Sequence, residues 1–184
     1  MYNNQRIIKE LKPYIPVADI FRIYEKEAGC AFLDSSLVND LGRYSIIGRA
    51  PYLKLVKDGD TFTVNGKPET GKTFEDYMRE YLNTHEDKNE CPLPIVSGAI
   101  GYFSYDYGRE QMGVPTGEKD LVTIPEAVLT FYDCFIVEDC REKRTYLVSN
   151  GITGNAPELI RSMEKEIQEN VKFGKISVSE AEKK

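Results

Sequence analysis

The residues best suited to chemistry in this 184-residue chain begin at Asp34 and Ser35, directly after the apolar run at positions 30–33. If that run is a strand, a carboxylate and a hydroxyl stand together at the rim of a sheet. Such a pair has the charge and the hydrogen-bonding capacity to hold the ammonium and carboxylate groups of an amino acid. Asp and Ser also form turns by bonding their own backbone, and the residues alone favour that plainer interpretation.

Other chemistry-bearing patterns are weaker. Gly98 and Gly101 are followed neither by a lysine nor by a helix of the phosphate-loop type, so they predict close packing rather than a nucleotide site. Asp106 and Arg109 predict a structural ion pair, which contributes little when exposed. The sequence contains no recognisable pair of catalytic carboxylates and no base near a nucleophile. We therefore predict no catalytic residue in this chain.

Cysteine and histidine usage argues against a metal site. The chain has four cysteines without Cys-x-x-Cys spacing and a single histidine, His85, so a zinc site of the usual kind lacks ligands. We interpret the cysteines as reduced thiols that serve mostly for packing. No metal ligand and no cofactor of this chain are predicted.

The composition is that of a soluble globular protein. Hydrophobic residues make up 41% of the chain and charged residues 29%, and the formal net charge is −6. An acidic chain without a basic cluster does not suit nucleic acid. No segment approaches the roughly 20 apolar residues that span a bilayer, and the N-terminus lacks the apolar stretch of a secretory signal. We expect a cytoplasmic protein that binds neither nucleic acid nor membrane.

The elements that would position Asp34 and Ser35 lie in the first third of the chain. Apolar residues at helical spacing predict a helix over 17–24 that stops before Gly29. Short strands are expected at 30–33 and 43–48. Alternating residues on both sides of the Asp58-Gly59-Asp60 turn then predict a hairpin, with strands at 52–57 and 61–64.

The remaining pattern continues the alternation of strands and helices. Thr73 and Asp76 resemble a capping box, and an apolar stripe of helical period runs on to Leu82. An exposed loop, a strand interrupted by Gly98 and Gly101, and a second loop reaching Pro125 should follow. The other expected elements are a hairpin of strands 127–137 and 144–149, a helix over 155–167 and a polar stretch over 176–184. Strands joined by short turns, with about three packed helices, predict an α+β fold built on mostly antiparallel β-sheet.

Three sequence blocks, in this order, resemble one enzyme family. The first is Phe32-Leu33-Asp34-Ser35 with Gly42-Arg43-Tyr44-Ser45-Ile46-Ile47-Gly48 and Pro51. The second is Gly98-Ala99-Ile100-Gly101-Tyr102-Phe103-Ser104-Tyr105-Asp106. The third is Phe131-Tyr132-Asp133 with Ile136-Val137 and Asp139, then Tyr146-Leu147-Val148-Ser149. Together they are similar to the N-terminal region of component I of the chorismate-utilising synthases, which comprise anthranilate synthase and aminodeoxychorismate (para-aminobenzoate) synthase.

The resemblance implies a tryptophan site. The family's leucine-leucine-glutamate-serine motif lines that site, and it falls on residues 32–35, with Asp34 in place of the glutamate and Ser35 matching directly. The second contact segment falls on Leu41, Gly42, Arg43 and Tyr44, where backbone groups and the aromatic ring would close over an indole. The alternative for this segment is a plain strand with an exposed arginine.

The resemblance also implies a domain plan. Residues 1–174 would form the non-catalytic N-terminal domain, and 175–184 would lead to a C-terminal chorismate-binding catalytic domain that these residues do not include. In the family that domain binds chorismate and magnesium, and a glutamine amidotransferase subunit supplies ammonia. The chain alone is therefore expected to be inactive.

Three functional hypotheses remain. The run Tyr105-Asp106-Tyr107-Gly108-Arg109 is more similar to the aminodeoxychorismate branch, which belongs to folate biosynthesis. The anthranilate branch, with tryptophan feedback inhibition, is the first alternative, and a free-standing amino-acid-binding module is the second. A small independent catalyst is the least favoured interpretation.

Overall fold

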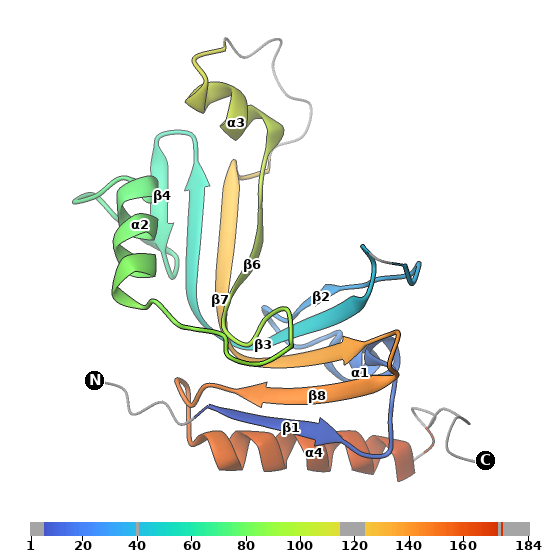
Figure 1. Cartoon of the computed structure of the whole chain (residues 1–184). Helices are drawn as coiled ribbons and strands as arrows, with labels where there is room; N and C mark the ends of the chain where they lie inside the picture. The colour runs from blue at the N-terminus through green and yellow to red at the C-terminus, as the bar shows by residue number, and fades with distance from the viewer. Residues whose placement is uncertain (1–5, 40, 115–123, 173, 175–184) are drawn as a thin grey trace. The chain divides into compact units, whose positions relative to one another are not determined.

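The computed structural model of the chain describes residues 6–39, 41–114, 124–172 and 174 (Figure 1). These residues fold into two compact units. The first unit comprises residues up to Tyr52 together with Asn89–Gly98 and the chain from Tyr132 onward, and the second comprises Leu53–Lys88 and Ala99–Phe131. No helix among the described residues is long and apolar enough to cross a membrane.

The first unit is built on antiparallel strand pairs. Strand β1 (Ile7–Leu11) pairs with β8 (Arg144–Ser149), which forms a hairpin with the second part of β7 (Ala127–Asp139). Strand β2 (Ala31–Leu33) pairs with the first part of β3 (Tyr44–Asp58). Both β3 and β7 are long enough to contribute residues to each unit.

Two helices supply the core of the first unit. Helix α1 (Val17–Tyr24) buries Val17, Ile20 and Tyr24, and α4 (Ala156–Lys172) buries Ile160, Met163 and Ile167. Figure 1 shows α4 running along the β1–β8 pair. These residues meet apolar side chains of the strands in one cluster, and each fully buried side chain contributes about 1.5–3 kcal/mol. The helical spacing of apolar residues in the sequence therefore marks the core-facing stripes.

The second unit places a helix over a small group of aromatic rings. Besides parts of β3, β6 and β7 it contains β4 (Thr61–Val64), β5 (Lys67–Pro68), α2 (Phe74–Thr84) and α3 (Tyr105–Gln111). The Thr73 hydroxyl accepts a hydrogen bond of 3.1 Å from the Asp76 amide, which caps α2. Behind this cap the Phe74 ring contacts Phe62, Phe103 and Tyr107 edge-on. The predicted cap at Thr73 is confirmed, whereas of the predicted apolar stripe Phe74 is buried and Leu82 is 50% exposed.

The two glycines of β6 (Gly98–Phe103) have different roles. A Cβ atom at Gly101 would lie 1.9 Å from the carbonyl oxygen of Val128, so the neighbouring strand comes too close for any side chain. Gly98 has a φ of 124°, which L residues rarely adopt. The interpretation of these glycines as packing features is thus confirmed at Gly101.

The α+β fold with mostly antiparallel sheet is confirmed, with three differences in its elements. The strands expected at 43–48 and 52–57 form the single 15-residue strand β3, whose two parts pair with different partners and meet at Ala50, where φ is 52°. The loop expected after β6 instead begins with α3, where the Ser104 hydroxyl accepts from the Tyr107 amide. Strand β1 was not predicted. The polar stretch 176–184 lies outside the described residues.

Candidate functional site

The pairing of β2 with β3 brings the two predicted contact segments together. Phe32 lies opposite Ile47 and Leu33 opposite Ile46. Continuing this antiparallel register past the end of β2 places Asp34 and Ser35 beside the beginning of β3. Two segments that are about ten residues apart in the sequence thus form one edge, which we call the rim (Asp34, Ser35, Arg43, Tyr44 and Ser45).

Hydrogen bonds fix the geometry of the rim. The Ser35 hydroxyl donates to the carbonyl oxygen of Tyr44 at 2.6 Å, and the Ser35 amide donates to the Ser45 hydroxyl at 3.0 Å. The Ser45 hydroxyl in turn donates to an Asp34 carboxylate oxygen at 3.1 Å. Ser45 is only 2% exposed, whereas Asp34 is exposed. The buried Ser45 therefore holds the open carboxylate of Asp34 in place.

The guanidinium of Arg43 is held by a carboxylate on the neighbouring hairpin. Its Nε and Nη2 donate to one oxygen of Asp139 at 3.0 and 2.6 Å, and its centre lies 5.1 Å from the ring centroid of Tyr44. The other Asp139 oxygen accepts from the amides of Arg141 and Glu142 in the turn. Burial works to raise the pKa of Asp139, but Arg43 and the turn amides outweigh it and lower that pKa. Arg43 is thus an ion-paired residue whose side chain is 38% exposed, and the alternative of a plain strand with an exposed arginine stays open.

The loop that carries Leu41 and Gly42 is shaped by its backbone. The side-chain oxygen of Asn39 accepts from the amides of Leu41 and Gly42 at 2.8 and 2.7 Å. A Cβ atom at Gly42 would lie 2.3 Å from the carbonyl oxygen of Leu37, so this turn requires glycine. Leu41 is 98% exposed, and its side chain is thus turned to solvent.

The rim offers groups that suit a small zwitterion. Asp34 accepts one internal hydrogen bond, which leaves acceptor capacity for an ammonium group. Arg43 uses two of its five N–H groups on Asp139, so the others can meet a carboxylate. Neither Ser45 nor Asp139 was predicted as a site residue. Ser45 carries a signal in the sequence, because it is a polar residue that alternates with the apolar Ile47 on the buried face of β3.

Among the described residues, no group of three or more His, Cys, Asp or Glu side chains gathers closely enough to hold a metal ion. The four cysteines are free thiols, and burial raises the pKa of Cys134 to about 12 and that of Cys30 to about 11. Neither thiol is ionised at neutral pH, so neither is activated as a nucleophile.

Relatives with curated names are all larger than this chain. The chain is 31% identical over 122 residues to anthranilate synthase alpha subunit 2, chloroplastic, of Arabidopsis thaliana, a match that covers 60% of this chain and 20% of the relative. It is 26% identical over 149 residues to anthranilate synthase component 1 of Acetivibrio thermocellus, covering 74% and 29%. The chain thus spans about a fifth to three tenths of the length of these relatives. No family profile matches it.

A solved structure shares the fold. Anthranilate synthase component I from Streptococcus pneumoniae TIGR4 superposes with a TM-score of 0.58 at 19% identity, over 72% of this chain and 30% of that one. At this identity the likeness supports the fold alone. The sequence relatives and the shared fold together confirm the recognition made from the three blocks: the chain is similar to component I of the chorismate-utilising synthases and shares the fold of part of such an enzyme.

Proposed function

We propose that the chain acts as the N-terminal domain of an anthranilate synthase component I. The whole enzyme would add ammonia, released from glutamine by an amidotransferase subunit, to chorismate. The observation that carries this proposal is the set of curated relatives, which bear the name of anthranilate synthase rather than that of the aminodeoxychorismate enzyme. Chorismate and magnesium would bind to a catalytic region outside these 184 residues.

In this proposal the rim holds an aromatic amino acid, with tryptophan as the expected ligand. The Asp34 carboxylate would receive the ammonium group, and the remaining N–H groups of Arg43 would receive the carboxylate. The Ser35 oxygen donates internally to Tyr44 but can still accept a hydrogen bond from the ligand. The internal bonds of Ser45 and Asp139 support this role, because they pre-organise the charged groups before a ligand arrives.

Calorimetric titration of the chain with L-tryptophan tests the rim. We expect Asp34→Asn and Ser35→Ala each to weaken tryptophan binding about tenfold. Each substitution removes one side-chain group of the rim that would bond to the ligand. Asp60→Asn is the matched control, since Asp60 is exposed in the hairpin turn of the other unit. Binding that is equally strong in all three variants would contradict the assignment of the rim. Tight binding by the chain alone would favour the free-standing module, and no binding would favour a pocket completed by the catalytic region.

The aminodeoxychorismate branch remains the second candidate because of residues 105–109. This run forms α3, in which Arg109 contacts Asp106 at 3.4 Å and the Tyr107 hydroxyl donates to Glu75 at 3.0 Å. Joining the chain to the catalytic region of a relative and supplying chorismate with ammonia would distinguish the branches. Formation of anthranilate supports the main proposal, and formation of aminodeoxychorismate would replace it with the second candidate.

A further inference from the structure

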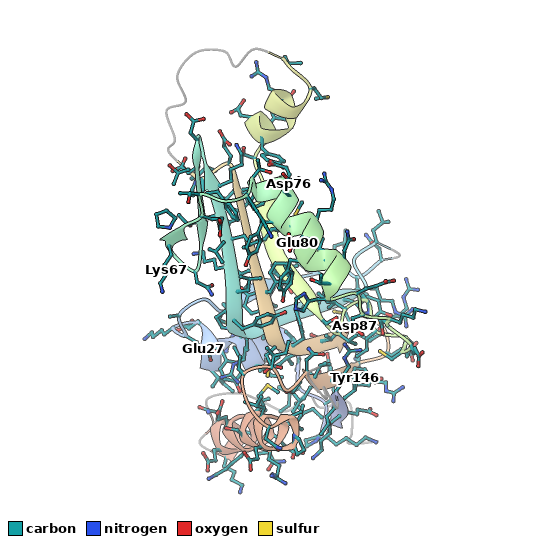
Figure 2. The ribbon with its side chains drawn as sticks, turned by 90° about the vertical axis from the view of Figure 1, so that its left-hand side faces the viewer. Glu27, Lys67, Asp76, Glu80, Asp87 and Tyr146 are labelled. Atoms are coloured by element: carbon teal, nitrogen blue, oxygen red, sulfur yellow. The ribbon has the colours of Figure 1, made fainter. Side chains whose placement is uncertain are left out.

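A second candidate site lies in the first unit and shares no residue with the rim. It is a cavity of about 170 Å³, several times the volume of one water molecule, between α4 and the strand that carries Arg49. Glu27, labelled in Figure 2, stands at its wall together with Arg49, Ser162 and Glu166. Leu159 and Met163 of α4 give it an apolar lining. The cavity therefore combines an apolar surface with charged groups.

The charged groups of the cavity form one network. Nε and Nη2 of Arg49 donate to the same oxygen of Glu27 at 2.9 and 2.6 Å, and Nη1 donates to Glu166 at 3.3 Å. The Ser162 hydroxyl donates to the other Glu166 oxygen at 3.0 Å. Two carboxylates face one guanidinium, so the lining carries a net charge of about −1 at neutral pH. A monovalent cation would neutralise it.

The network leaves acceptor atoms on three lining residues. Both N–H groups that reach Glu27 use one carboxylate oxygen, and the described residues place no donor on the other. The Glu166 oxygen bonded to Ser162 has a further lone pair, and the Ser162 oxygen donates without accepting. A primary ammonium group has three N–H donors and no acceptor, which matches this set.

A buried tyrosine lies next to the network. The Arg49 guanidinium lies 3.5 Å from the ring centroid of Tyr24, which is 3% exposed. Within the described part of the chain the Tyr24 hydroxyl makes no well-formed hydrogen bond, although Glu166 lies near enough to act on it as a hydrogen-bonding group. Burial raises the pKa of Tyr24, and Arg49, Glu166 and Glu27 act on the same hydroxyl, so it stays protonated beside three of the lining residues.

We propose that this cavity binds a small organic compound with a primary ammonium group and a short apolar body. The ammonium would bond to Glu27, Glu166 and Ser162, and the apolar part would pack on Leu159 and Met163. An anion of the same size would be repelled by the two carboxylates. A quaternary ammonium would lack the N–H donors that the acceptors require.

Nuclear magnetic resonance titration of the chain with propylammonium chloride tests this proposal. The Nε–H signal of Arg49 and the amide signals of residues 159–166 report on the cavity directly. We expect saturable shifts of these signals with propylammonium and none with propionate or tetramethylammonium. Shifts of equal size with all three salts, or no saturable shift with propylammonium, would overturn the proposal.

Variants of α4 locate the binding. Glu166→Gln should weaken propylammonium binding about tenfold, whereas Glu164→Gln should change it less than about twofold, because Glu164 pairs with Lys9 instead. Ser162→Ala keeps both ion pairs of Arg49 and should weaken propylammonium binding about threefold. This variant therefore tests the location of the site even if Glu166→Gln fails to fold. An equal loss in Glu164→Gln and Glu166→Gln, or unchanged binding in Ser162→Ala, would contradict the site.

Discussion

Gly42 and Asp139 show how single residues fix the rim. Gly42 has no room for a side chain because the Leu37 carbonyl stands where its Cβ would be. Asp139 joins the Arg43 guanidinium to the amides of the β7–β8 turn. Neither residue has to contact a ligand to affect the rim, because each helps to determine the position of Arg43 or of the loop that precedes it. Both can be tested through stability as well as through binding.

We expect Gly42→Ala to lower the free energy of unfolding by about 1–3 kcal/mol, because the backbone must shift to remove the contact with Leu37. Urea unfolding followed by circular dichroism measures this. Gly108→Ala is the matched control, since a Cβ at this position in α3 meets no atom within 4 Å. That substitution should be neutral or stabilising. Equal losses in the two variants would contradict the steric argument.

Asp139→Asn should cost about 1–2 kcal/mol at pH 7, because it removes the charge that pairs with the partly exposed Arg43. The folded-state pKa of Asp139 is lowered, so its contribution is fully present above the ordinary Asp value of about 3.9 and is lost as pH falls through the folded-state pKa. The difference between wild type and variant should therefore shrink at acidic pH. Unfolding curves at a series of pH values measure it, and a difference that grows towards acid would refute the pairing.

At the scale of elements, helix α1 is capped by a residue from a distant strand. The residue before the helix is Pro16, which has no side-chain acceptor. Glu138 of β7 instead accepts from the Val17 amide at 2.8 Å and also from the Tyr14 hydroxyl. An anion at a helix N-terminus is favourable both as an acceptor and against the helix dipole. The start of α1 thus depends on the fold of the β7–β8 hairpin.

Glu138→Ala should lower the free energy of unfolding by about 1–3 kcal/mol, because it leaves the Val17 amide and the Tyr14 hydroxyl without their acceptor in a buried place. Glu138→Gln should cost less, since its amide oxygen can still accept. Glu142→Ala, at an exposed position of the following turn, serves as the control and should change stability by less than about 0.5 kcal/mol. Chemical unfolding ranks the three variants, and a loss in Glu142→Ala equal to that in Glu138→Ala would exclude a specific cap.

At the scale of the whole molecule, apolar side chains remain open on each unit. In the first unit the exposed apolar side chains close in sequence to the rim residues are Leu33, Leu37, Val38 and Leu41. In the second unit the exposed set is Leu82, Tyr102, Phe103, Tyr105, Met112, Val114 and Ile124. Single exposed apolar residues are ordinary, but groups of them are typical of surfaces that associate.

Light scattering of the chain should therefore show self-association that increases with concentration. Replacing Leu37 and Leu41 together by serine should reduce it. Stability should change by less than about 0.5 kcal/mol per site, because these side chains are 72% and 98% exposed. Leu82→Ser, which removes an exposed leucine of the second unit, is the control for a general loss of surface apolarity. A clean monomer at every concentration would contradict the prediction.

The sequence by itself determined the elements with strong local signals. The Asp58-Gly59-Asp60 hairpin, the Thr73 cap and the apolar stripes of α1 and α4 each depend on residues within a few positions of one another. The sequence blocks also pointed to the enzymes that the chain resembles. Local patterns failed where a tertiary contact decides: β1 is a strand because β8 pairs with it, and β3 continues through Ala50 because each of its parts has a different partner.

The rim was only half determined by sequence. The order of the blocks pointed to Asp34, Ser35 and the 41–44 segment, but only the β2–β3 register brought the two segments together. The ion pair of Arg43 with Asp139 joins residues 96 positions apart, and the cavity at Arg49 joins Glu27 to Glu166. Such contacts exist only after the chain has folded, because hydrogen bonds and ion pairs need their atoms within about 3 Å. No spacing in the sequence sets that distance.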